Sequence, residues 1–171
     1  MYYQPGHYAI STVTNHDYDF FGDHTTGNGN FMTIDGAGYS NPLKTVWQQQ
    51  ILNVTPNTNY VFQAWARAIG SPYGPEITLG FYANGSEIGT LSLTNVPEWQ
   101  LFSVIWNSGS NTDITLSIID LQTNNYTAGN DFALDDISFN RSTVPVPAAI
   151  WLFGSGVAAL AGLRRLRRKK H

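Results

Sequence analysis

The sequence predicts an all-β fold, an antiparallel β-sandwich, followed by a single C-terminal transmembrane helix. Short runs that alternate apolar and polar residues occur at even spacing, with turn residues between them. No window before residue 144 has a convincing 3.6-residue period, and the longest uncharged apolar run lies near the end of the chain. Short strands joined by turns favour a sandwich, in which two sheets pack face to face.

The strand signals follow one another along the chain. The run NYVFQAWARA alternates two sets of side chains, and a Thr-Pro-Asn turn in front of it delivers the chain into that strand. An Asn-Gly pair between two β-rich runs is the strongest short signal for a hairpin. A Ser-Gly-Ser-Asn turn separates two further strands, and NDFALDDISF forms the last. The expected strands lie within residues 59–68, 76–93, 99–120 and 130–139.

Charge separates the last thirty residues from the rest. Through Asn140 the only basic residues are Lys44 and Arg67, whereas all 12 Asp and Glu residues lie there. A nucleic-acid partner requires the opposite balance and is excluded. About 140 residues make one ordinary domain with a single core. The chain has no cysteine, which excludes disulfides, thiol catalysis and thiolate metal sites.

The C-terminal segment has the features of a membrane span. No charged residue occurs from Ala148 to Leu163, and counting from Pro145 the stretch has 19 residues, about enough to cross a hydrocarbon core. The alternative is a buried hairpin helix followed by a basic tail. The positive-inside rule places the C-terminus in the cytoplasm and everything upstream outside. The basic residues concerned are Arg164, Arg165, Arg167, Arg168, Lys169 and Lys170.

The same segment resembles a PEP-CTERM sorting signal. The resemblance lies in Val144, Pro145 and Pro147, then AAIWLFGSG, then the cluster that begins with Arg164 and Arg165; the family has Glu where this chain has valine between the prolines. It implies a Gram-negative, exopolysaccharide-producing bacterium. It further implies that an exosortase, a membrane cysteine transpeptidase-like enzyme, cleaves near the motif. The protein would then pass from a transient inner-membrane anchor to the outer cell surface or extracellular matrix.

These features divide the chain into three parts. We expect a β-sandwich domain over residues 1–140, a linker over 141–147, and the helix and basic tail of the sorting signal over 148–171. Export requires an N-terminal signal peptide, but the opening MYYQPGHYAI has no basic start and no long apolar run. We therefore expect the N-terminus to be truncated.

Residues 20–139 resemble a galactose-binding-like jelly roll of the kind found in carbohydrate-binding modules. The resemblance implies an eight- or nine-stranded jelly roll, often with one structural calcium ion, and a glycan as a partner. The order and spacing of five segments carry it. They are FGDHTTGNGNFMTIDGA, VWQQQILNVTPNTNYVFQAWARA, ITLGFYANGSEIG, EWQLFSVIWNSGSNTDITLSIID and GNDFALDDISF.

A calcium ion is expected between the loop 22–30 and the last strand, which meet at one end of related jelly rolls. The loop offers carboxylate, hydroxyl and carbonyl oxygens, the hard ligands that calcium prefers. If Ile137 and Phe139 point into the core, Asp135 does too, and an inward carboxylate is costly without a metal or other partner. The alternative is that Asp135 accepts hydrogen bonds from backbone N–H groups of a loop. The predicted ligands are Asp23, Thr26, Asn28, Asp135 and Asp136.

Aromatic side chains are candidates for glycan binding, because their planes match the C–H faces of sugar rings. Gln63, Trp65 and Arg67 share one strand face, opposite the face that carries Tyr60. Tyr82 similarly opposes its neighbour Phe81. The alternative is that these aromatic residues belong to the core. The predicted glycan patch is Gln63, Trp65, Arg67 and Tyr82.

No catalytic residues are predicted, and we expect the protein not to be an enzyme. The histidines are scattered, and no nucleophile–base motif is readable. Asp135 and Asp136 are adjacent on a strand and should point to opposite faces, so they cannot flank one glycosidic bond. The expected function is an exported surface or matrix protein with a glycan-binding-like sandwich, associated with exopolysaccharide or biofilm. A purely structural envelope protein and a glycan-processing enzyme are the alternatives.

Overall fold

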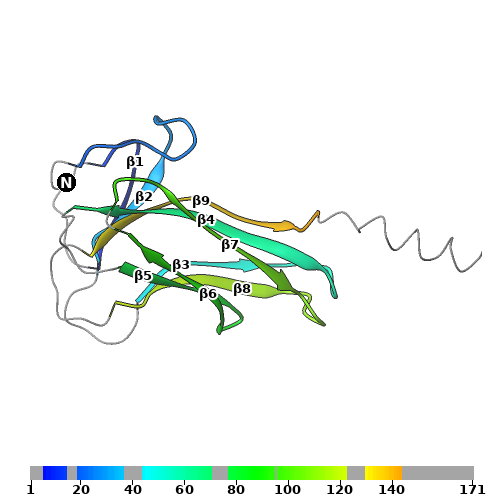
Figure 1. Ribbon diagram of the computed structural model, residues 1–171. Helices are drawn as coiled ribbons and strands as arrows, with labels where there is room; N and C mark the ends of the chain where they lie inside the picture. Colours follow the sequence, from blue (N-terminus) through cyan, green and yellow to red (C-terminus); the bar gives the residue numbers. More distant parts are fainter. Residues whose placement is uncertain are drawn as a thin grey trace, which may run out of the picture.

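The computed structural model contains two β-sheets packed face to face (Figure 1). No helix in the described part of the chain is long and apolar enough to cross a membrane. The predicted C-terminal helix and the sorting-motif residues Val144, Pro145, Pro147, Arg164 and Arg165 lie outside that part. The structure describes residues 6–14, 19–36, 44–70, 77–94, 96–122 and 130–143.

All strand pairs are antiparallel, which confirms the predicted all-β sandwich. The first sheet has the order β1-β2-β9-β4-β7 and the second β3-β8-β5-β6. The first comprises β1 (Tyr8–Ser11), β2 (Phe31–Ile34), β9 (Asp131–Arg141), β4 (Asn59–Ile69) and β7 (Gln100–Asn107). The second comprises β3 (Lys44–Ile51), β8 (Ile114–Asp120), β5 (Ile77–Ala83) and β6 (Ser86–Leu93).

The core lies between the two sheets, and the alternating burial along β4 shows every second side chain turned toward it. The rings of Phe81 and Phe102 stack across it with centroids 3.4 Å apart, and Phe62 meets Phe81 edge-on. Trp47 and Trp106 pack against this core, in agreement with the alternative interpretation of the aromatic residues. The largest fully buried side chains include Phe62, Phe81, Phe132, Ile77, Leu79, Leu93, Ile114, Leu116, Ile118 and Leu134.

The predicted hairpin between β5 and β6 is confirmed. Asn84 has φ 49° and Gly85 has φ 76°, and two successive positive φ angles are what a two-residue type I′ turn requires. Asparagine and glycine are the residues that adopt this conformation most easily. The two residues therefore fix the register of the hairpin.

A bulge in β9 changes which side chains of this strand face the core, so the orientation predicted from the sequence does not hold. The pairing with β4 shifts between Gln63 and Trp65, and Asp136 has φ 46°. Leu134 before the bulge and Ile137 after it both pack in the core, although they are three residues apart. Asp135 therefore faces outward, and the prediction that it points inward is wrong. One extra residue in a strand changes the alternation beyond it.

The last strand extends past the expected domain boundary at residue 140. Arg141 lies in β9, and its guanidinium donates a hydrogen bond to the Thr55 hydroxyl. The backbone N–H of Ser142 donates to the Asn59 carbonyl at 2.8 Å. The folded unit thus includes the first residues of the segment expected to be a linker.

Candidate functional site

The loop before β2 folds around the carboxylate of Asp23. Asp23 Oδ1 accepts hydrogen bonds from the Gly29 N–H at 2.7 Å and the Thr26 hydroxyl at 2.9 Å, and Oδ2 accepts one from the Thr26 N–H at 3.0 Å. Burial would raise the pKa of Asp23, but the donors from Gly29 and Thr26 outweigh it and lower the pKa to about 2. Asp23 is therefore ionised at neutral pH and holds its own loop closed.

Both aspartates of the β9 bulge bind this loop. The His24 N–H donates to Asp135 Oδ2 at 2.8 Å, and His24 Nδ1 lies 2.8 Å from Asp136 Oδ2. The Thr25 hydroxyl donates to the same Asp136 oxygen at 2.6 Å. The hydrogen bonds from Thr25 and then from His24 lower the pKa of Asp136. The prediction that the two aspartates point apart is wrong, because the bulge lets both reach one loop.

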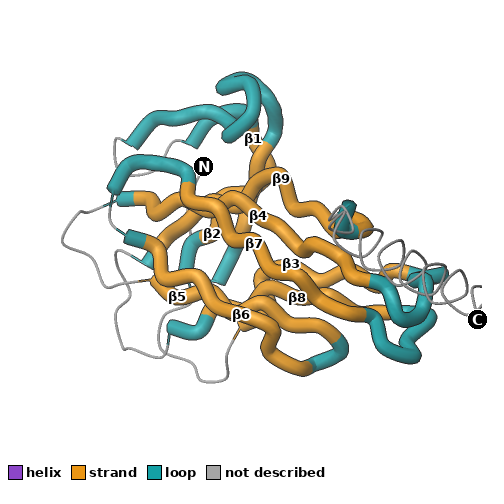
Figure 2. The backbone as a smooth tube through the Cα atoms, turned by 45° about the vertical axis from the view of Figure 1, so that its right-hand side comes forward, coloured by secondary structure: helices purple, strands orange, loops and turns teal. Residues whose placement is uncertain are grey.

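The loop covers Trp65, the tryptophan predicted to stack on a sugar. The rings of His24 and Trp65 are stacked with centroids 3.7 Å apart and planes 16° apart. Trp99 meets His24 edge-on, with centroids 6.2 Å apart. Figure 2 shows loops in teal rising beside β1, at the edge of the five-stranded sheet. The imidazole therefore occupies the ring face that a sugar would need.

Arg67 is covered by the same part of the chain. Its guanidinium lies 3.8 Å from the centre of the Phe21 ring and donates to Asp19 Oδ1 at 3.0 Å. Gln63 donates to the Ser103 hydroxyl at 3.1 Å on the same sheet, whereas Tyr82 lies on β5 of the other sheet. The structure thus does not bring the four predicted glycan-binding residues together.

The predicted calcium ligands face hydrogen-bond donors. The carboxylates accept the hydrogen bonds given above, the Thr26 hydroxyl donates to Asp23, and the Asn28 amide donates to the Thr26 carbonyl at 3.4 Å. Within the residues that the structure describes, no three His, Asp or Glu side chains form a group that could hold a metal ion. In this arrangement the residues do not fit calcium, which stays a prediction of the resemblance.

The outer face of the four-stranded sheet presents a different surface. The strand register places Gln48, Ser117, Tyr82 and Glu87 in one row across β3, β8, β5 and β6. The Tyr82 hydroxyl donates to Glu87 Oε2 at 3.1 Å. Burial and this neighbouring carboxylate raise the pKa of Tyr82, so the phenol remains protonated at neutral pH. An aromatic ring is therefore flanked by amide, hydroxyl and carboxylate groups.

Gly80 provides the space in which the Tyr82 ring lies. A Cβ atom at Gly80 would be 2.7 Å from Tyr82 Cε2 and 3.1 Å from Leu121 Cδ1, so both side chains rest over the glycine. Thr90 pairs with Gly80, and the hydroxyls of Thr78 and Ser92 lie 3.3 Å apart nearby. Sequence reasoning selected Tyr82 because it opposes Phe81, but it missed the role of Gly80 and did not indicate that β3 and β8 extend the row.

Comparisons with solved structures identify the fold. No protein-family model matches the chain, and no curated protein matches its sequence. The chain resembles the EclA C-terminal domain, a sugar-binding protein, with TM-score 0.54 and 16% identity over 63% of this chain and 75% of that one. It resembles an apo cyclase from Fischerella sp. with TM-score 0.55 and 12% identity over 81% and 74%. A CBM4 structure matches with TM-score 0.47 and 18% identity over 82% and 84%.

The likeness to these proteins shows a β-sandwich that serves more than one purpose. A sugar-binding domain and a cyclase share it with this chain at low sequence identity. Fold similarity at this level does not decide function, which depends on the surface that each protein builds on its sandwich.

Proposed function

We propose that the protein is a non-enzymatic carbohydrate-binding protein that holds a glycan on the outer face of its four-stranded sheet. The observation that carries this proposal is the Tyr82 ring, placed over Gly80 between Ser117 and Glu87. The C–H face of a sugar ring would pack on the phenol, as apolar groups pack on aromatic rings generally. Sugar hydroxyls would exchange hydrogen bonds with the exposed Gln48 amide and would donate to the exposed Glu87 carboxylate.

The charge of the face favours a neutral glycan. Glu87 is the one charged side chain in the row that contains Tyr82, and the region through Asn140 is strongly acidic. A polysaccharide that carries uronate or sulfate groups would be repelled by this field. One structural relative, the EclA C-terminal domain, is a sugar-binding protein, which is consistent with this class of ligand.

Binding by variants tests the proposal. Tyr82→Ala should weaken binding of the full chain to a neutral polysaccharide by at least about tenfold, because it removes the ring that a sugar would contact. Tyr82→Phe keeps the ring and should retain most of the affinity. Ile105→Ala is a control on the opposite sheet, where Ile105 is exposed, and should have no effect. Affinity electrophoresis and a glycan array measure the difference.

Failure to bind any neutral glycan would contradict the proposal and favour the alternative of a purely structural envelope protein. Equal binding by wild type and Tyr82→Ala would place the glycan elsewhere on the molecule. Turnover of a bound glycan would favour the enzyme alternative instead.

Export and sorting complete the proposal. The order of Pro145-x-Pro147, an apolar run and a terminal arginine cluster supports cleavage by an exosortase, after which the protein would reside on the outer surface or in an exopolysaccharide or biofilm matrix. A simple anchor would not need the proline motif. Mass spectrometry of the mature extracellular protein should find no peptides from residues 148–163. Recovery of those peptides would make the segment a permanent anchor.

A further inference from the structure

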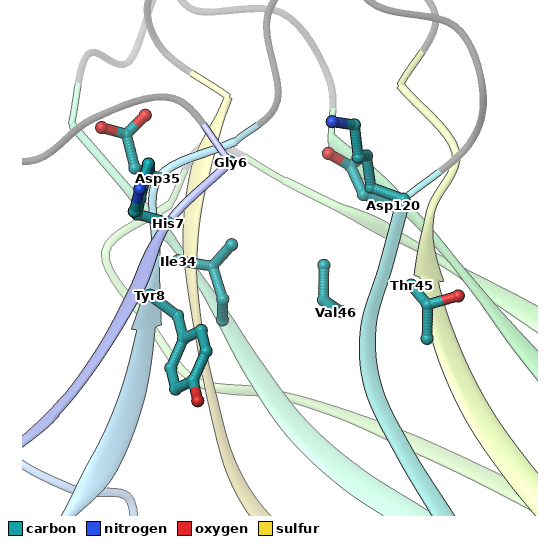
Figure 3. Close-up of a pocket in the computed structure, with 9 residues that line it drawn as sticks. Gly6, His7, Tyr8, Ile34, Asp35, Thr45, Val46 and Asp120 are labelled. Atoms are coloured by element: carbon teal, nitrogen blue, oxygen red, sulfur yellow. The ribbon is translucent and has the colours of Figure 1, made fainter.

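A pocket of about 220 Å³ opens between the two sheets at the edge of the sandwich. It shares no residue with the Tyr82 row or with the loop around Asp23. Figure 3 shows Tyr8 and Ile34 on one side, from β1 and β2, and Thr45 and Val46 on the other, from β3. The pocket is thus built by strands of both sheets.

The end of β2 and an irregular stretch of β3 position the two apolar side chains that form the floor of the pocket. Two hydrogen bonds tie the start of the described chain to the end of β2, from the Gly6 N–H to the Asp35 carbonyl and from the Asp35 N–H to the His7 carbonyl, each 2.9 Å long. The register of β3 is irregular between Thr45 and Trp47, and Val46 there packs against the core. Ile34 and Val46 therefore point into the space between the sheets (Figure 3).

The polar wall of the pocket includes two carboxylates. Asp35 and Asp120 stand on opposite sides of the opening and are only 7% and 3% exposed (Figure 3). Asp120 Oδ1 also accepts the Gln122 N–H at 2.9 Å, which orients the carboxylate. Lys44, which pairs with Asp120 in the strand register, is the one ammonium group of the lining, and His7 lies on the other side near Asp35 (Figure 3). A lining with two carboxylates and one ammonium disfavours an anionic ligand and suits one that donates hydrogen bonds.

We propose that this pocket is a second carbohydrate site that takes a single neutral sugar residue. The sugar's C–H face would rest on Ile34 and Val46, and its hydroxyls would donate to Asp120. The volume lies below the range of about 300–1,000 Å³ that is usual for drug-sized ligands, so the pocket suits one ring rather than a chain. The inference rests on the proposed function, because it takes the ligand to be a glycan.

Titration calorimetry of the full chain with glucose, galactose and mannose tests the inference. At least one of these sugars should bind with a dissociation constant on the order of 1 mM. Val46→Phe fills the pocket and should weaken that binding by at least about tenfold. Asp120→Asn preserves the shape of the side chain but removes its charge, and it should also weaken binding. Ile105→Ala, an exposed position on β7 outside both proposed sites, should leave monosaccharide binding unchanged.

The possible outcomes separate the two sites. Binding that survives both Val46→Phe and Asp120→Asn, or no binding of any of the three sugars, overturns the pocket inference. Glucuronate should not bind, and binding as tight as that of the neutral sugars would contradict the charge argument. Monosaccharide binding without polysaccharide binding would contradict the Tyr82 proposal alone. Melting curves show whether each variant folds, and if Val46→Phe does not fold, Asp120→Asn decides.

Discussion

The two outer faces of the sandwich differ in what lies on their aromatic residues. On the five-stranded sheet, Trp65 is covered by the His24 ring and Arg67 by the Phe21 ring. On the four-stranded sheet, Tyr82 lies over Gly80 and remains partly exposed, with its hydroxyl bonded to the Glu87 carboxylate. The ring of Trp65 is therefore covered by a loop, whereas the ring of Tyr82 is left partly open.

The covered face contains a second, smaller core. Phe31, Ile69 and Ala133 are buried there, with Phe21 and Trp99 packed against them. The rings of Phe21 and Phe31 are 5.4 Å apart, and Trp99 meets both edge-on. Aromatic residues on an outward strand face thus indicate either a ligand or a loop, and only the position of the loop distinguishes the two. Changes to the loop and to the open face should therefore act on different properties.

Opening the loop should cause the largest loss of stability. Asp23→Ala removes the acceptor for the Gly29 and Thr26 N–H groups, which would be left without their partners. We expect the melting temperature to fall by several degrees while glycan binding at Tyr82 is retained. Asn28→Ala, in the same loop, removes only the 3.4 Å hydrogen bond of its amide and should have a much smaller effect. Equal melting curves for the Asp23 variant and wild type would contradict this account of the loop.

Acid should weaken the loop in the same way. The pKa of Asp23 is about 2 in the folded protein, below its ordinary value of 3.8, so its contribution to stability is present above pH 4 and is lost as the pH falls toward 2. The pKa of Asp136 is also lowered, so Asp136 likewise contributes stability that is lost as the pH falls. The difference in melting temperature between wild type and Asp23→Ala should shrink over this interval. A difference that stays constant from pH 5 to about pH 2 would disprove the linkage.

His24→Ala should have a moderate effect. It removes the stack on Trp65 and the hydrogen bond to Asp136, together worth about 1–2 kcal/mol of unfolding free energy. His24→Phe keeps a ring on the indole and should lose about half as much. Denaturant unfolding monitored by circular dichroism measures both values. A His24→Ala protein as stable as wild type would show that the ring does not hold the loop.

Chelation should have the smallest effect. The hydrogen bonds that surround Asp23, Asp135 and Asp136 predict that EDTA leaves the melting temperature unchanged, whereas the resemblance to calcium-containing jelly rolls predicts a fall. Elemental analysis of the purified protein accompanies the melting curves. Stoichiometric calcium together with a lower melting temperature in EDTA would establish the ion and show that the loop changes its hydrogen bonds to bind it.

Local patterns made most of the fold predictable. The alternation of residues 59–68 and the Asn84-Gly85 turn depend on neighbours in sequence, and both are confirmed. The bulge at Asp136 was not predictable from alternation, because any extra residue in a strand looks like a continuation of it. The Asp-Asp pair was the available hint, since aspartate tolerates positive φ better than most residues.

The candidate site was predictable only in part. The sequence predicted that the loop 22–30 meets Asp135 and Asp136, and the hydrogen bonds of His24 and Thr25 confirm this contact. It did not predict which atoms meet, since the same oxygens serve a metal ion and backbone N–H groups equally well. It also could not separate Trp65 from Tyr82, because loop coverage depends on tertiary packing.

Mapping a bound neutral oligosaccharide by backbone amide chemical shifts tests the central claim most directly. We predict that the perturbed amides lie on the four-stranded sheet, around Gln48, Ser117 and Tyr82. The amides of Gln63 and Ser103, on the opposite sheet, should not move. Perturbations centred on Gln63 and Ser103, with none around Tyr82, would show that the glycan binds beside the covered tryptophan and would contradict the account.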